Sequence, residues 1–370
     1  MQMNGADTVE MSIGEALEKG VLRNETLAYY LARTQLFLLK CGARADCIRF
    51  RQHLETEKAH YSRDCWDAEL LTSFGWVECV GHADRSAYDL NKHAEATSKK
   101  LRAQKVFRPP REVRVVKFKL DMREIGTTFR KSAVGVKAVR AAFESLNEAD
   151  ATALMEKLET EGEASLAVTC DESVTVTRGM VKSLTVGTEK QHFVEFTPKV
   201  VEPSFGIGRI LYALLEHCFA TPYTVTADDG TQQVDTKRVV MRFAPAVAPY
   251  KASVLSLSNN AELCALAEQI QGVLNTSFVR ASKDTSGVAP GRKYARSDEI
   301  GTPFAVMVDF DSVSDHAVTI RERDTQKQVR VPIAQVPQVL QQLTVFGTKC
   351  WDDVMAEFPE FLRPADEDTA

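Results

Sequence analysis

A nine-residue segment, Val201 to Arg209, places three chemical functions close together: VEPSFGIGR. Glu202 can hold a cation, and the two glycines free the backbone for a turn and for the close approach of a ligand. Arg209 begins the apolar, helix-like stretch Ile210 to Phe219, and both its guanidinium and a helix N-terminus favour an anion. The segment therefore suits a ligand that is positive at one end and phosphorylated at the other.

The same residues also allow a structural explanation. Glu202 would then cap a turn before a buried helix, and Arg209 would be solvated. A lone Gly-x-Gly-Arg does not cradle phosphate, because nucleotide-binding loops carry further glycines or a terminal Gly-Lys-Ser/Thr. Neither extension is present here, so the residues alone leave both explanations open.

Glu78 is a second candidate, because it lies in an apolar run from Phe74 to Gly81 that predicts a buried strand. An acid between Val77 and Cys79 is costly to bury unless it is paired or binds a metal. Glu78 could therefore hold Mg²⁺ or another cation near a ribose or phosphate. An acid on the exposed face of a half-buried strand explains the pattern equally well.

Acids, histidines and arginines are unusually dense between positions 49 and 89. A structural network of ion pairs is the favoured interpretation, and a metal-binding role for a lone histidine such as His53 or His60 is disfavoured. No Cys-x-x-Cys pair occurs among the eight cysteines, so no metal site is assigned and free thiols are expected. The cluster comprises Arg49, Arg51, His53, His60, Asp64, Trp66, Asp67, Asp84, Arg85 and Asp89.

A basic segment follows Gly291, where Arg292, Lys293 and Arg296 surround Tyr294. Basic side chains beside an aromatic ring could contact RNA phosphates and stack a base. A solvated helix in an acidic domain is the alternative.

The candidates belong to a chain of 370 residues with 44% apolar content, 26% charged content and a net charge of −5. These values are ordinary for a globular protein, and they exclude a basic nucleic-acid signal from the chain as a whole while allowing a local basic face. No apolar run approaches the ~18 residues of a membrane span, so no membrane partner is expected. The N-terminus lacks a basic and apolar leader, which predicts a cytoplasmic protein.

The elements that must position these residues change in character along the chain. Helical periodicity runs from Ile13 to Gly42, and Arg108–Arg111, with two consecutive prolines, predicts a break. Between about 110 and 190, two helical patterns and several short strands predict an inserted subdomain. Beyond about 235, strands and helices alternate, which indicates an open α/β sheet.

Nine segments, in one order, resemble class II glycyl-tRNA synthetases of the eukaryotic type. The resemblance extends from about Met11 to Phe361 and is loose only between 110 and 190. It rests on RFRQH (49–53), HY (60–61), DCWDAE (64–69), GWVECVG (75–81), ADRSAYDL (83–90), EPSFGIGR (202–209), AVAPYK (246–251), GRKYARSDEIG (291–301) and VDFD (308–311).

The resemblance implies part of an α+β, antiparallel-sheet class II catalytic core with an inserted α+β subdomain, followed by an α/β anticodon-binding domain. The family's motifs 1 and 2 lie upstream of the segment that matches Met11 and are not found here, so the chain corresponds to a C-terminal part. The implied domains are the first part of the core (1–109), the insertion (110–190), the motif 3 strand and helix (191–234) and the anticodon-binding domain (235–370).

The resemblance also implies roles for individual residues. Glu202 would pair with the ammonium of glycine, and Arg209 would be the ATP-binding arginine of motif 3. Glu78 would help to organise the nucleotide and Mg²⁺, which makes Arg209 and Glu78 the implied catalytic residues. The implied glycine site is Glu202, Pro203 and Ser204, the ATP site is Glu78, Cys79 and Arg209, and the tRNA contacts are Arg292, Lys293 and Arg296.

The activity implied by the resemblance is that of a glycine–tRNA ligase. Glycine would be activated with ATP and Mg²⁺ and transferred to tRNA-Gly, and the full-length protein would be a homodimer. Because motifs 1 and 2 are not found, the alternative is a truncated, catalytically inactive synthetase-like protein that binds tRNA.

Overall fold

The computed structural model of the protein describes residues 8–129, 135–168, 173–226, 231–235 and 238–361. Two compact units are present, one formed by Met1–Ser86 with Lys199–Ala370 and the other by Ala87–Pro198. Every described cysteine is a free thiol, and Cys170 lies outside the described residues. No helix in the described part of the chain is both long and apolar enough to cross a membrane.

A four-stranded antiparallel sheet, in the order β1-β2-β3-β8, is the centre of the first unit. The helix expected from Ile13 to Gly42 is divided into two, because Asn24 accepts a hydrogen bond from the Leu27 amide and so begins a new helix. That helix ends at Gly42, whose φ of 100° only glycine adopts readily. The elements are α1 (Ile13–Glu18), α2 (Glu25–Cys41), η2 (Ala45–Cys47), β1 (Ile48–Gln52), β2 (Asp64–Thr72), β3 (Gly75–Ser86), β8 (Val200–Phe205) and α7 (Ile207–Cys218).

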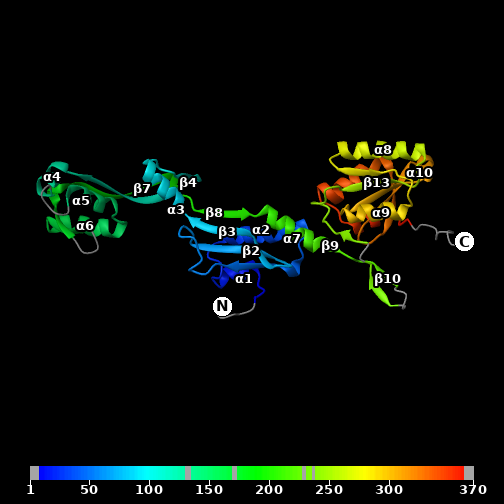
Figure 1. Cartoon of the computed structure of the whole chain (residues 1–370). Helices are drawn as coiled ribbons and strands as arrows, with labels where there is room; N and C mark the ends of the chain where they lie inside the picture. Colours follow the sequence, from blue (N-terminus) through cyan, green and yellow to red (C-terminus); the bar gives the residue numbers. More distant parts are fainter. Residues whose placement is uncertain (1–7, 130–134, 169–172, 227–230, 236–237, 362–370) are drawn as a thin grey trace. The chain divides into compact units, whose positions relative to one another are not determined.

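One face of this sheet is apolar and is covered by α2 and α7 (Figure 1). Ala68 and Leu70 of β2 and Val80 of β3 are fully buried there against Leu38 and Ile210. Because side chains alternate along a strand, the neighbouring residues point to the opposite face, which is polar. We call this surface the polar face.

A β-bulge in β3 lies next to the candidate acid Glu78. Ala68 of β2 pairs with Val80 and Glu69 pairs with Glu78, so Cys79 is an extra residue without a partner across the ladder. Cys79 and Val80 are both buried in the apolar core, while Glu78 is exposed. The bulge therefore explains two consecutive core residues in a strand that otherwise alternates.

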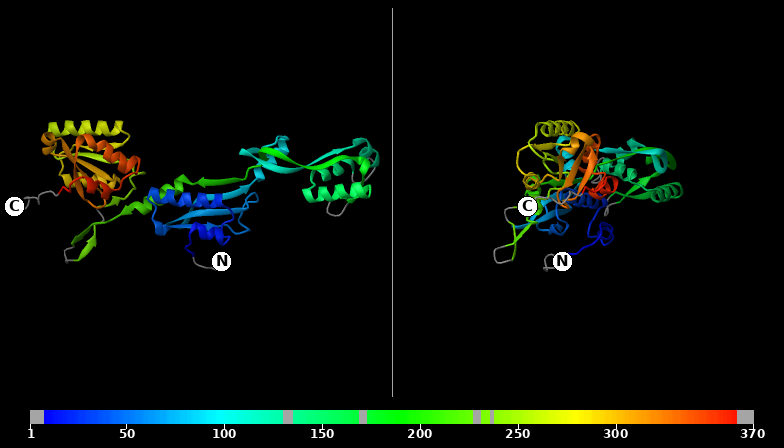
Figure 2. Two further views of the ribbon diagram at one scale, coloured as in Figure 1. Left: turned by 180° about the vertical axis from the view of Figure 1, so that it is seen from behind. Right: turned by 90° about the vertical axis from the view of Figure 1, so that its right-hand side faces the viewer.

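The second unit has a core of its own beside a long two-stranded ribbon of β4 and β7 (Figure 2). The break predicted at Arg108–Arg111 is wrong, because β4 continues through both prolines. The ladder passes from Val106 directly to Arg111, so the prolines occupy an irregular stretch in which no backbone N–H is needed. The elements are α3 (Tyr88–Thr97), β4 (Ala103–Leu120), α4 (Met122–Phe129), α5 (Gly135–Glu144), α6 (Glu148–Thr160), β5 (Glu163–Ala167), β6 (Ser173–Thr177), η3 (Arg178–Met180) and β7 (Val181–Phe196).

The C-terminal part of the first unit contains a mixed five-stranded sheet in the order β14-β13-β15-β16-β17. β13 is parallel to both β14 and β15, and the remaining pairs are antiparallel. α8 packs on one face, where Val254 is buried, and Tyr294 of α9 packs on the other, beside Leu255 (Figure 1). The expected α/β sheet is therefore present, with two antiparallel strands added at one edge.

Short strands lie between α7 and this sheet, and further helices follow it. The elements are β9 (Phe219–Ala220), β10 (Thr224–Thr226), β11 (Gln232–Val234), β12 (Val240–Met241), β13 (Ala252–Ser256), α8 (Ala261–Thr276), β14 (Ala281–Asp284), α9 (Pro290–Glu299), β15 (Phe304–Val308), α10 (Asp311–Asp315), β16 (Ala317–Glu322), β17 (Gln328–Pro332), η4 (Ile333–Gln335), α11 (Val336–Leu340), η5 (Gln341–Val345) and α12 (Trp351–Glu357).

Candidate active site

The pairing of β3 with β8 assembles one half of the candidate site. Ala83 is the register partner of Glu202, and Gly81 is the partner of Ser204. The Ser204 hydroxyl donates to the Glu202 carboxylate at 3.1 Å, and the same carboxylate forms an ion pair with Arg85. A carboxylate, a hydroxyl and a guanidinium thus lie within one small area of the polar face.

Arg85 is held from its other side by an aromatic ring. Its guanidinium carbon lies 4.1 Å from the ring centre of Tyr61, a cation–π geometry that fixes a planar guanidinium. Arg85 belongs to the cluster that the sequence predicts as structural ion pairs, and its partner Glu202 is 117 residues away. No local sequence pattern therefore predicts the pairing of Arg85 with Glu202.

The other half of the candidate site is the contact between Glu78 and Arg209. The Arg209 guanidinium donates to the Glu78 carbonyl at 2.9 Å and lies 3.7 Å from its carboxylate. Both side chains are more than half exposed, at 58% and 52%. The structure therefore brings the two predicted catalytic residues together and leaves them open to solvent.

Gly206 allows this contact. Its amide donates to the Cys79 carbonyl at 2.8 Å, and a Cβ atom at this position would lie 3.2 Å from that oxygen. A larger residue would push the start of α7, and Arg209 with it, away from β3. The glycine expected to permit close approach is thus used for strand–helix contact.

Gly81 of β3 lies between the two halves and places no side chain on the polar face. An ideal Cβ atom on Gly81 would lie 3.8 Å from carboxylate oxygens of both Asp67 and Glu78. Two carboxylates therefore face one point above a residue without a side chain. Oxygen ligands of this kind suit a hard divalent cation.

Charged residues of β1 and β2 line the rest of the polar face. Arg49 lies 2.6 Å from Glu69, and Arg51 lies 3.2 Å from Glu69 and 3.5 Å from Asp67. The two carboxylates are only 9% and 4% exposed, so removing their guanidinium partners would leave buried charges unpaired. The predicted network of ion pairs is confirmed for these residues.

Cys79 and Pro203, which the sequence places in the ATP and glycine sites, have different surroundings. The Cys79 thiol is buried in the core, and burial raises its pKa. Its side chain therefore faces away from the polar face, and only its backbone carbonyl reaches the β3–β8 seam. Pro203 is partly buried and is the register partner of His82.

The basic residues of α9 are not equivalent. Arg292 and Arg296 are exposed, and Arg296 lies 3.2 Å from Asp284. Lys293 is fully buried, and its ammonium donates to the Ser256 carbonyl at 2.6 Å. Burial lowers the pKa of this lysine. The sequence predicts a surface contact for Lys293, but the residue lies on the helix face that packs against β13 and does not present its charge at the surface.

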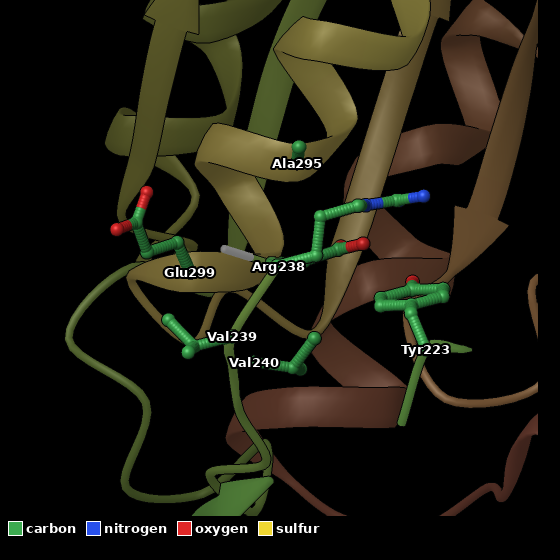
Figure 3. A pocket seen from close by; sticks show the side chains of 7 residues that line it. Tyr223, Arg238, Val239, Val240, Ala295 and Glu299 are labelled. Carbon is green, nitrogen blue, oxygen red and sulfur yellow. The ribbon is translucent and has the colours of Figure 1, made fainter. Parts of the chain in front are cut away.

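A small pocket lies beside α9, and its lining residues are Tyr223, Arg238, Val239, Val240, Ala295, Asp298 and Glu299. In Figure 3 the Arg238 side chain extends over the Tyr223 ring, at 3.8 Å from its centre, while Glu299 points away. Its volume of about 40 Å³ is room for roughly one water molecule. This pocket is too small for a nucleotide base.

Comparison with known proteins agrees with these observations. A family model described as an anticodon binding domain matches residues 251–343. The chain is 42% identical to the glycine–tRNA ligase of Drosophila melanogaster over 361 residues, which is 97% of this chain and 45% of the relative. Nearly the whole chain is therefore similar to part of a glycine–tRNA ligase.

Two further glycine–tRNA ligases are similar to this chain over most of its length. The glycine–tRNA ligase of Caenorhabditis elegans is 40% identical over 99% of this chain and 47% of its own length. That of Methanocaldococcus jannaschii is 38% identical over 90% of this chain and 55% of its own length. The chain thus spans about half the length of the curated glycine–tRNA ligases that it matches.

Proposed function

We propose that this protein has glycine–tRNA ligase activity, in which glycine is activated by ATP and transferred to tRNA-Gly. The observation that carries the proposal is the convergence of the Glu202–Ser204–Arg85 group and the Glu78–Arg209 pair on the polar face. The names of the relatives support the same chemistry. Because the relatives are about twice as long, the proposal concerns the whole protein rather than these residues alone.

The ion pair between Glu202 and Arg85 is suited to a zwitterion. Glycine carries an ammonium that would replace the Arg85 guanidinium on Glu202, and a carboxylate that would face Arg85. The Ser204 hydroxyl would add a further polar contact. Selection of glycine would follow from exclusion of any larger side chain, because rejection by steric clash can be strong.

The Glu78–Arg209 pair supports the proposed site for ATP. Arg209 at the start of α7 would bind phosphate, favoured by its own charge and by the helix N-terminus. The carboxylates of Glu78 and Asp67, which face one point above Gly81, have the oxygen donors that Mg²⁺ prefers. When bound, Mg²⁺ would neutralise charge on the phosphates. Catalysis by these side chains would consist mainly of positioning and of charge stabilisation.

We extend the proposal to the remaining parts of the chain. Residues 1–86 and 199–234 would contribute to the catalytic core, and 235–370 would bind the anticodon arm of tRNA. The inserted subdomain, expected from 110 to 190, would be the whole second unit, Ala87–Pro198. Within this last part, Arg292 and Arg296 are the proposed phosphate contacts, whereas the buried Lys293 would position α9. Free thiols at all described cysteines are typical of a reducing compartment, and the proposed location is the cytoplasm, with a homodimer as the proposed assembly of the full-length protein.

The test of catalysis is glycine-dependent exchange of pyrophosphate into ATP by the full-length protein. We expect exchange that glycine starts and alanine does not. A Glu112→Gln variant, altered at an exposed acid of β4, is the control and should retain the activity. A folded full-length protein without exchange would overturn the proposed activity.

The alternative is a tRNA-binding protein without catalysis, and the match of residues 251–343 to an anticodon binding domain supports the tRNA binding. Its test is the binding of tRNA-Gly across a range of salt concentrations. The double change Arg292→Ala and Arg296→Ala should weaken binding and flatten its salt dependence, because fewer counterions are released. Unchanged affinity at every salt concentration would remove α9 from the proposed RNA contact.

A further inference from the structure

Three side chains with different donor atoms meet at the end of the polar face nearest to His53. The His53 amide donates to the Cys65 carbonyl at 2.9 Å, which extends the β1–β2 ladder by one residue and places the two directly opposite each other. Asp67 lies two residues further along β2, on the same face. The ligand atoms of His53, Cys65 and Asp67 all lie within 4.8 Å of one another.

The backbone holds these positions before any ligand arrives. Two of the residues are cross-strand neighbours, and the third follows on the same strand. The tetrahedral ligands of Zn²⁺ are separated by roughly 3.4 Å, given bond lengths of about 2.0–2.3 Å. Side-chain rotations that move the ligand atoms by about an ångström would therefore bring all three around one ion, without a change in the strands.

The donor set selects the class of metal. One imidazole nitrogen, one thiol and one carboxylate suit Zn²⁺ and similar borderline ions, whereas Mg²⁺ prefers oxygen ligands alone. Three protein ligands would leave a fourth tetrahedral position open to water. The sequence pattern disfavours such a site because the ligands lack a recognisable spacing, and only the strand register brings them together.

The three residues can exchange their present contacts for bonds to a metal. The His53 Nε2 atom lies 2.7 Å from the Asp67 carboxylate, and its Nδ1 atom is buried without a partner among the described residues. Arg51 also contacts Asp67, at 3.5 Å, but it has closer partners in Glu57 at 3.0 Å and Glu69 at 3.2 Å. If Asp67 turned toward a metal, Arg51 would remain paired.

Binding of the metal to Cys65 would replace the S–H bond with a metal–sulfur bond and release one proton to solvent.

We propose that His53, Cys65 and Asp67 form a binding site for one Zn²⁺-like divalent ion, which differs from the proposed Mg²⁺ site in its nitrogen and sulfur ligands. The site does not depend on the proposed ligase activity, since its residues and its test involve the metal alone. It shares Asp67 with the point above Gly81. A borderline ion would consequently compete with Mg²⁺ for this carboxylate.

The test is spectroscopic titration of the full chain with Co²⁺ under reducing conditions. We expect one equivalent to produce both the intense visible bands of tetrahedral Co²⁺ and a thiolate-to-cobalt charge-transfer band in the near ultraviolet. Zn²⁺ should abolish both signals, and a 100-fold excess of Mg²⁺ should leave them. A folded wild-type chain without a charge-transfer band would overturn the proposal.

Matched variants identify the thiol. Cys65→Ser should remove the charge-transfer band, and His53→Asn should lower the affinity at least tenfold. Cys264→Ser and Cys350→Ser, which alter thiols outside the cluster, should change neither. A band that survives in Cys65→Ser but disappears in Cys350→Ser would assign the metal to the exposed Cys350 thiol and reject the site.

Discussion

At the scale of single residues, the main feature of the polar face is that its charged side chains pair with one another. Glu202 and Arg85 neutralise each other in the absence of a ligand. A zwitterionic ligand can exchange its own charges for theirs, so that neither Glu202 nor Arg85 loses an opposite charge. This arrangement prepares the site for a small amino acid.

The first prediction concerns Glu202→Gln. Removing the negative charge should weaken glycine binding by about 1.5–3 kcal/mol, the scale of a charge-assisted hydrogen bond. ATP binding, which is assigned to Glu78 and Arg209, should change little. Equilibrium binding of each ligand, measured separately, checks this prediction; an equal loss for both ligands would contradict the assignment of roles.

The second prediction concerns the buried pair of Asp298 and Arg321, which are 3.1 Å apart and 3% and 7% exposed. Burial raises the pKa of the Asp298 carboxyl, and Arg321 opposes that rise. Arg321→Met should cost about 3–5 kcal/mol of unfolding free energy at pH 8. In the variant, the pKa of Asp298 in the folded state rises further. The stability that comes from the protonated carboxyl is therefore present at low pH and is lost as the pH rises through this pKa.

Urea unfolding at pH 5 and pH 8 measures this difference, and the loss should be smaller at pH 5. Arg296→Met removes an exposed partner of Asp284 and serves as the control, with an expected cost of about 0–1 kcal/mol. The same loss for Arg321→Met at both pH values would exclude the proposed role of Asp298.

At the scale of elements, one glycine fixes the segment that leads into the five-stranded sheet. Gly301 has a φ of 79°, and a Cβ atom there would lie 2.2 Å from the Phe243 ring and 3.0 Å from the Met241 carbonyl. Arg323 donates to the carbonyls of Met241, Phe243 and Gly301 at 3.0–3.2 Å. These contacts hold the segment against the sheet.

The third prediction is that Gly301→Ala destabilises the protein by about 2–4 kcal/mol, the sum of left-handed backbone strain and overpacking. Thermal and urea unfolding measure the effect. Gly291→Ala is the matched control, because no atom lies within 4 Å of its added methyl group and it is part of helix α9. The control should be neutral or stabilising by up to about 1 kcal/mol; similar behaviour of both variants would count against the contact with Phe243.

Local patterns predicted several elements well and their partners poorly. The apolar run from Phe74 to Gly81 lies largely within β3, and the stretch from Ile210 lies in α7, because periodicity and glycines are local signals. The run through Pro109 was read as a break, although an irregular ladder accommodates it. Likewise, the burial of Lys293 depends on a contact with Ser256, 37 residues away, which no local pattern contains.

At the scale of the whole molecule, the second unit is inserted between two strands that pair with each other. Ser86 of β3 is the register partner of Val200 of β8, so the chain leaves and re-enters the sheet at adjacent positions. The second unit also has its own core, which includes Ile125, Val139 and Phe143. The helical patterns and short strands between about 110 and 190 indicate an insertion. Its ends depend on the register of β3 and β8, which the sequence does not show.

The fourth prediction is that the two units fold separately. Replacing residues 87–199 with a two-residue Asn-Gly turn should leave a soluble protein, because this turn joins adjacent antiparallel strands. The isolated segment 87–198 should also fold. Circular dichroism and thermal unfolding measure both products, and an aggregated or unfolded remainder would contradict the prediction. Deleting 148–180 alone, which cuts through the core of the second unit, is the control and should unfold that unit.

The bulge at Cys79 has a consequence for natural variation in chain length. Removing one residue from a strand normally turns all side chains beyond the deletion to the opposite face. At Cys79 the ladder already holds one residue too many, so its deletion would leave Val77 and Val80 toward the core and Glu78 and Gly81 toward the polar face. Cys79 is therefore a position in β3 where a single-codon deletion would spare the site, whereas deletion of Glu78 would remove one of its proposed ligands.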